Sequence, residues 1–107
     1  MRDLEVKDFS EIDKLSEMLD AAGIPHEDRP WLGGKQVNYP SCDNQVCDAI
    51  LNPYSYGHEE GLLEIMGLVK KRKTGDSVEG YLTAEEVFRR IRIHYRRHKN
   101  KMDKIEL

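Results

Sequence analysis

Apolar residues recur at intervals of three and four in two stretches, one near each end of the chain. The first stretch is bounded by Ser10, a residue type that caps helix N-termini, and by Gly23, which suits the left-handed position after a helix. Pro25 then prevents the helix from resuming. We therefore predict an amphipathic helix over about residues 10–22, whose buried stripe is Ile12, Leu15, Leu19 and Ala22.

The second periodic stretch begins with a capping box. Thr83 and Glu86 have the spacing at which each side chain satisfies the other residue's backbone N–H, and Leu82 can pack on Val87 as a hydrophobic staple. We predict a helix from this point to about residue 98, followed by a frayed tail over residues 100–107. The buried stripe would be Val87, Phe88, Ile91 and Tyr95.

Between the two helices the pattern changes to short strands and turns. Residues 24–29, 35–39 and 45–51 read as strands, and Gly33-Gly34 suits the tight turn of a hairpin. Residues 62–69 are the most apolar run, for which a buried strand is favoured and a short helix stays open. The basic residues 70–80 are predicted to form a connection that projects into solvent.

This order of elements predicts an α+β fold. A small antiparallel sheet of three to four strands would carry the N-terminal and C-terminal helices on one face, because neither helix can bury its stripe alone. The chain length of 107 residues suits one domain over 1–107, with a core over about residues 10–98. The other sheet face would stay partly exposed unless a partner or a second copy of the chain covers it.

Composition narrows the setting of the protein. No apolar run approaches the roughly 20 residues of a membrane span, and the first residues lack the apolar segment of a secretory signal. With only two cysteines, a disulfide scaffold is not expected, so we expect a cytoplasmic protein without membrane association. Residues 1–69 carry a net charge of −9 and residues 70–107 one of +6. Either these parts pair with each other, which we favour, or the basic end meets an acidic partner.

The sequence holds no strong catalytic or metal-binding motif. Cys42 and Cys47, with Asp43, Asp48 and His58 nearby, are ligand types for zinc, but the second pair of closely spaced ligands is missing. A Cys-His pair of Cys42 with His26 or His58 can be drawn, yet neither cysteine lies at a helix N-terminus that would activate it. We therefore expect no catalytic residues, no metal and no cofactor.

Two surfaces are candidates for binding. The loop over residues 52–61 presents Tyr54, Tyr56, His58 and Glu59, and Trp31 either joins them as an aromatic anchor or caps the core of the sheet. On the second helix, four arginines could contact phosphates or an acidic protein, although no nucleic-acid-binding motif accompanies them and the sequence pI is about 5.8. These arginines are Arg89, Arg92, Arg96 and Arg97.

Four segments are distinctive for their exact residues rather than for their hydrophobic periodicity: 47–50 (CDAI), 55–57 (SYG), 61–68 (GLLEIMGL) and 80–88 (GYLTAEEVF). In this order they resemble small uncharacterised proteins of phages, prophages and other mobile elements of Gram-positive gut bacteria, over residues 12–97. The resemblance implies a non-enzymatic binding protein that inhibits a host factor or captures a defence signal, with a protein or small-ligand partner or a homo-oligomeric state. Nucleic-acid binding through the basic helix is the alternative, and a small Cys/His or metal-dependent enzyme is the second alternative.

Overall fold

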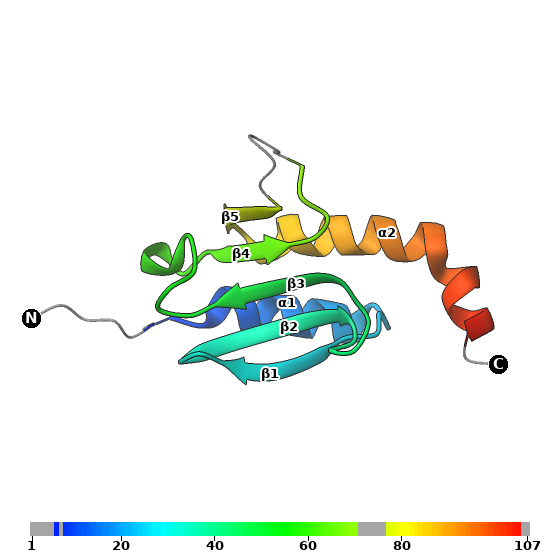
Figure 1. Cartoon of the computed structure of the whole chain (residues 1–107), viewed down its shortest axis with the longest axis horizontal. Helices are drawn as coiled ribbons and strands as arrows, with labels where there is room; N and C mark the ends of the chain where they lie inside the picture. The colour runs from blue at the N-terminus through cyan, green and yellow to red at the C-terminus, as the bar shows by residue number, and fades with distance from the viewer. Residues whose placement is uncertain (1–5, 7, 71–76, 106–107) are drawn as a thin grey trace, which may run out of the picture.

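The fold has two layers, a five-stranded antiparallel sheet and two helices behind it (Figure 1). The computed structural model describes residues 6, 8–70 and 77–105, with the backbone alone from residue 100. Its sheet is a meander in the order β1-β2-β3-β4-β5, so the α+β prediction is confirmed with one strand more than expected. The elements are α1 Ser10–Ala21, β1 Glu27–Trp31, β2 Gly34–Pro40, β3 Gln45–Leu51, η1 His58–Glu60, β4 Leu63–Met66, β5 Val78–Leu82 and α2 Ala84–Ile105.

Local signals account for most helix ends. Gly23 takes the left-handed conformation (φ 67°) immediately after the Ala22 C-cap, as predicted. The prediction that Ser10 is the N-cap is wrong, because Ser10 is already the first residue of α1. Phe9 is the N-cap and makes no side-chain cap bond, while Asp8 Oδ1 accepts a hydrogen bond from the Ser10 N–H at 2.9 Å.

The capping box of α2 is confirmed in both directions. Thr83 N–H donates to Glu86 Oε1 at 2.9 Å, and Glu86 N–H donates to Thr83 Oγ1 at 3.2 Å. A third acceptor comes from α1, because Glu11 Oε1 accepts the Ala84 N–H at 2.7 Å. The helix continues to Ile105, so its backbone passes the predicted end near residue 98.

The strands predicted over residues 24–29, 35–39, 45–51 and 62–69 are observed, most with shifted ends, but the turn predicted at Gly33-Gly34 is wrong by one residue and a fifth strand was not predicted. The β1–β2 turn consists of Leu32 and Gly33, both with positive φ (49° and 82°), and Gly34 already pairs with Trp31 in the hairpin. Part of the predicted solvent connection is instead β5, which pairs with β4. The strand was not predicted because the segment is short and contains Gly80, and glycine is depleted in strands. Residues 71–76 of the predicted connection lie outside the described part of the chain.

The core lies between the sheet and the helices. The alternation of β2 and β3 places one set of side chains toward α1 and α2, where they meet the helix stripes. Of the predicted stripes, Phe88 and Tyr95 are half-buried and Ala22 is exposed. The fully buried core is Ile12, Leu15, Leu19, Ile24, Val37, Tyr39, Cys47, Ala49, Leu51, Leu63, Ile65, Leu82, Ala84, Val87 and Ile91.

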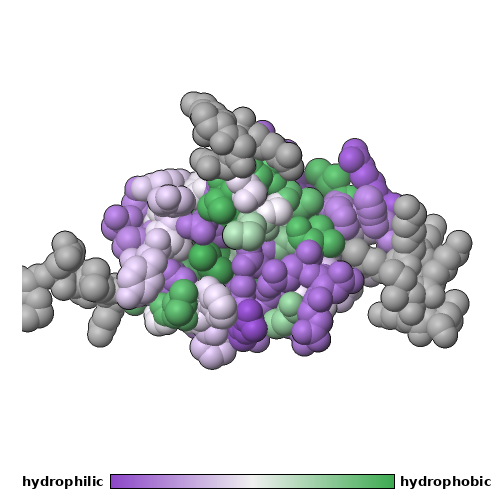
Figure 2. All heavy atoms as spheres, viewed as in Figure 1, coloured by the Kyte–Doolittle hydropathy of each residue, from purple (hydrophilic) through white to green (hydrophobic). Residues whose placement is uncertain are grey.

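The opposite sheet face carries a mixture of polar and apolar side chains, which Figure 2 shows interspersed over the sheet. Gln36 and Asn38 are buried on this face and are hydrogen-bonded within it. Gln36 donates to Asp48 Oδ2 at 2.7 Å and accepts from Arg29, while Asn38 accepts from Gln45. These bonds satisfy the buried amides, so part of the open face is closed by its own side chains.

Candidate functional site

One end of the sheet gathers exposed large side chains. The β1–β2 turn and the β3–β4 loop lie at this end (Figure 1). A Cβ added at Gly33 would lie 3.4 Å from Pro53 Cδ, so the turn packs directly against the start of the loop. Fractional exposure here runs from 37% at Trp31 to 71% at Tyr54. We call this set the aromatic end: Trp31, Leu32, Tyr54, Tyr56 and Tyr81.

The loop after β3 is held in place by two buried residues. Ser55 Oγ accepts the Asn52 N–H at 3.1 Å and donates to the Asn52 carbonyl at 3.0 Å. The Asn52 side chain in turn accepts the Tyr54 N–H at 2.8 Å, which forms an Asx turn. Tyr54 is therefore displayed by a braced loop, and little conformational entropy is left for binding to remove.

Tyr81 belongs to the same surface although its sequence context gave no indication of it. Its N–H donates to the Tyr56 carbonyl at 3.3 Å, and its own φ of 60° is positive. A Cβ at Gly80 would lie 2.4 Å from Tyr56 Cβ, so only glycine allows this close approach. Tyr56 is fixed from the other side, because Glu64 Oε1 accepts its N–H at 2.8 Å.

The remaining loop candidates divide into two roles. His58 Nδ1 lies 2.7 Å from the Ser55 carbonyl, so this ring braces the loop rather than facing outward. Glu59 is exposed and lies 3.6 Å from the same nitrogen. A position as a cap over the core of the sheet is excluded for Trp31. All five residues of β1 are exposed, and the Arg29 guanidinium lies 4.7 Å from the centre of the Trp31 ring. Trp31 therefore lies at the surface, and its role as an aromatic anchor stays a prediction.

On α2, Arg90 forms an ion pair with Glu79, whereas the four candidate arginines have no acidic partner among the described residues. Arg89, Arg96 and Arg97 are exposed, while the Arg92 guanidinium lies 5.3 Å from the centre of the Phe88 ring. Within the described residues, none of these four arginines forms an ion pair. The predicted pairing of the acidic and basic parts of the chain is therefore not seen at this helix, and its charge stays available.

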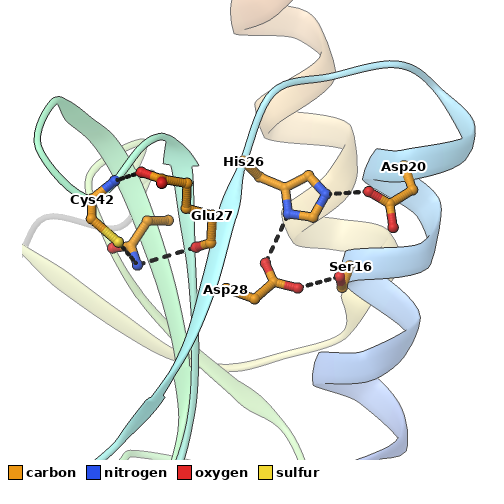
Figure 3. A network of polar contacts seen from close by, with 7 residues as sticks. Ser16, Asp20, His26, Glu27, Asp28 and Cys42 are labelled. Carbon is orange, nitrogen blue, oxygen red and sulfur yellow. Dashed lines mark hydrogen bonds and ion pairs between the residues drawn. The ribbon is translucent and has the colours of Figure 1, made fainter.

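The structure separates the groups that a Cys-His or metal site would need. The Cys42 Sγ accepts from Asn38 at 3.3 Å and its N–H donates to Glu27 Oε1 at 2.7 Å (Figure 3). Cys47 is buried, and burial raises the pKa of its thiol to about 12, with Asp48 adding to the effect. In the described part of the chain, no three His, Cys, Asp or Glu side chains converge as metal ligands.

His26 forms a polar network that the sequence did not reveal. Its Nε2 lies 2.7 Å from Asp20 Oδ1 and its Nδ1 lies 2.8 Å from Asp28 Oδ1, while Ser16 Oγ donates to the other oxygen of Asp28 (Figure 3). A nucleophilic triad needs the serine bonded to the imidazole, whereas this serine contacts the carboxylate. The network instead ties β1 to α1, with each ring nitrogen of His26 facing a carboxylate oxygen.

The fold and these surfaces define a two-layer α+β domain. It has a braced aromatic end, and a helix on which four arginines have no acidic partner among the described residues. No protein-family model, curated protein or solved structure matches the chain. Neither helix, within the residues described, has both the length and the apolar character needed to cross a membrane.

Proposed function

We propose that this chain is a non-enzymatic binding protein that captures a protein partner through its aromatic end. The observation that carries the proposal is the convergence of five large exposed side chains from three separate segments of the chain on one end of the sheet. Tyrosine and tryptophan are enriched among the residues that dominate interface energies, because they bury much area and lose little entropy.

The mechanism is stoichiometric capture on a preformed surface. The Asx turn at Asn52 and the close contact at Gly80 fix the backbone beneath Tyr54 and Tyr56, so the rings can act as rigid anchors. The resemblance to proteins of mobile elements supports a host factor as the partner and inhibition of that factor as the result.

A pull-down followed by a quantitative binding measurement tests this proposal. We expect the tagged chain to enrich a host protein that binds with one-to-one stoichiometry in calorimetry. The double substitution Tyr54→Ala, Tyr56→Ala should weaken that binding by at least about 30-fold, the effect of a central interface anchor. The matched control is Arg89→Gln, which changes an exposed side chain on α2. Equal affinity of the wild type and the double variant would refute capture by the aromatic end.

A second candidate function is nucleic-acid binding through α2. Arg89 and Arg96 have no acidic partner among the described residues, and this supports the function because cations without protein partners are free to meet phosphates. The double substitution Arg89→Gln, Arg96→Gln should reduce the slope of log affinity against log salt by about 2, close to one unit per lost phosphate contact. An unchanged slope in DNA and RNA titrations would exclude this function, and the tyrosine variant serves as the control.

A further inference from the structure

A cavity of about 370 Å³ lies between α2 and the residues that follow β4. Its helix wall consists of side chains at positions i, i+3, i+4, i+7 and i+8, which form a single stripe on α2. The opposite wall is residues 68–70. We call it the histidine pocket; its lining is Leu68, Val69, Lys70, Arg90, Ile93, His94, Arg97 and His98.

An ion pair holds the two walls of this pocket together. The Arg90 guanidinium donates to Glu79 at 2.8 and 3.0 Å and to the Leu68 carbonyl at 3.2 Å. Glu79 also accepts the Lys70 N–H at 3.0 Å. The charge of Arg90 is therefore balanced by Glu79, and the pocket is built without requiring a ligand.

Apart from the ion-paired Arg90, the charged side chains in the described lining of the pocket are all positive. Among the described residues that line the pocket, Lys70 and Arg97 carry fixed positive charge and none is acidic. The rings of His94 and His98 stack with centroids 4.2 Å apart. His98 Nδ1 is buried without a hydrogen-bond partner, one of two such side-chain atoms in the described part of the chain. The pocket therefore combines two fixed cations with two stacked imidazole rings.

Tyr39 fixes the orientation of the neighbouring ring. Its hydroxyl lies 2.7 Å from His94 Nδ1, and when the hydroxyl donates, His94 Nε2 carries the ring proton. Burial, and then the adjacent His98, lower the pKa of His94, and the groups around it are Tyr39, His98, Arg97, Lys70 and Arg90. Without a bound anion, positive charge on this ring is therefore unfavourable.

We propose that the histidine pocket binds the phosphomonoester group of a small molecule, with Lys70 and Arg97 contacting the phosphate oxygens and the two histidines completing the site. A phosphomonoester carries a charge of about −1.5 to −2 at neutral pH, which matches the two unbalanced cations. The apolar side chains of Leu68, Val69 and Ile93 offer contact to the rest of such a ligand. The cavity lies at the lower end of the range of about 300–1,000 Å³ for small-molecule sites.

Titration with inorganic phosphate, followed by the imidazole NMR signals, tests the site directly. At constant ionic strength, phosphate should shift the ring signals of His94 and His98 in the wild type. Arg97→Gln should weaken the apparent affinity about tenfold, the effect of one charge-assisted contact. Lys99→Gln removes the same charge from an exposed side chain of α2 that does not line the pocket, and should change the affinity less than about twofold. Arg97 and Lys99 are both exposed, so both variants should fold.

Two further probes separate the sources of the signal. Acetate tests whether any small anion suffices, and an oligonucleotide without a terminal phosphate tests whether backbone phosphates are the ligand. The proposal is overturned by the absence of ring shifts with phosphate, by equal losses in the Arg97 and Lys99 variants, or by either rival probe binding as tightly as phosphate. These variants leave the aromatic end intact, so the result is independent of partner capture.

Discussion

The pKa of His26 is raised in the folded chain, so replacing this residue by alanine should cost more stability at about pH 6 than at about pH 9. The ring is mostly buried between two carboxylates, with only 9% of the side chain exposed. Burial opposes protonation, but the hydrogen bonds to Asp20 and Asp28 outweigh it, and the pKa of His26 is raised above its ordinary 6.5. The folded chain thus holds this proton more tightly than the unfolded chain does.

The sign of the pH dependence follows from that difference. A raised folded-state pKa gives stabilisation that is fully present below pH 6.5 and is lost as the pH rises through the folded-state pKa. Hydrogen bonds to charged groups are worth about 1.5–3 kcal/mol, but Asp20 and Asp28 are 72% and 42% exposed, which places each contact nearer about 1 kcal/mol. His26→Ala should therefore lower the free energy of unfolding by roughly 2 kcal/mol at about pH 6, and clearly less at about pH 9.

Urea denaturation of the wild type and the His26→Ala variant at both pH values measures this difference. An NMR titration of the His26 ring gives the folded-state pKa independently, and Asp20→Asn should lower it. Glu17→Gln, a carboxylate on α1 without contact to the ring, is the matched control and should leave the titration unchanged. An equal loss of stability at both pH values, or a titration at or below pH 6.5, would refute the reasoning.

Three other substitutions or treatments test separate parts of the structure. Arg90→Ala removes the ion pair that Arg90 makes with the nearly buried Glu79 carboxylate and should cost about 3 kcal/mol in urea denaturation; a loss below about 1 kcal/mol would show that the pair is dispensable. Iodoacetamide should modify Cys42 and spare Cys47, whose pKa of about 12 and burial suppress the thiolate; modification of Cys47 in native buffer, seen by mass spectrometry, would contradict this. Gly34→Ala would place Cβ 2.0 Å from a carbonyl oxygen of β3 and should cost about 2 kcal/mol or more; an unchanged melting temperature would disprove the clash.

Elements whose signals lie within a few residues of each other could be predicted from the sequence. Gly23 and the Thr83–Glu86 capping box mark helix ends through contacts between near neighbours, and both are observed. β5 could not be found in this way. It contains Gly80 and follows a run of basic residues, so its identity as a strand depends on pairing with β4, a contact that periodicity does not report.

The candidate site shows the same division. The aromatic composition of the loop pointed to Tyr54 and Tyr56, but the sequence indicated neither the exposure of Leu32 and Tyr81 nor their positive φ angles. The contacts of His26 depend on how α1 packs beside β1, so no local pattern contained them. The histidine pocket likewise requires residues 68–70 to return to α2, although the spacing of its helix wall could be read directly.

The order of the strands in the sheet has a consequence for how the chain reaches its native state. All four strand pairings join neighbours along the chain, so each hairpin can form without waiting for a distant segment. Short loops lose little entropy on closure, and topologies rich in local contacts fold faster than those with crossovers. One long loop must also close, because α1 and α2 lie far apart in the sequence and meet where Glu11 Oε1 accepts the Ala84 N–H. The entropy lost on folding is thus divided among several short closures and one long one between the first helix and the last.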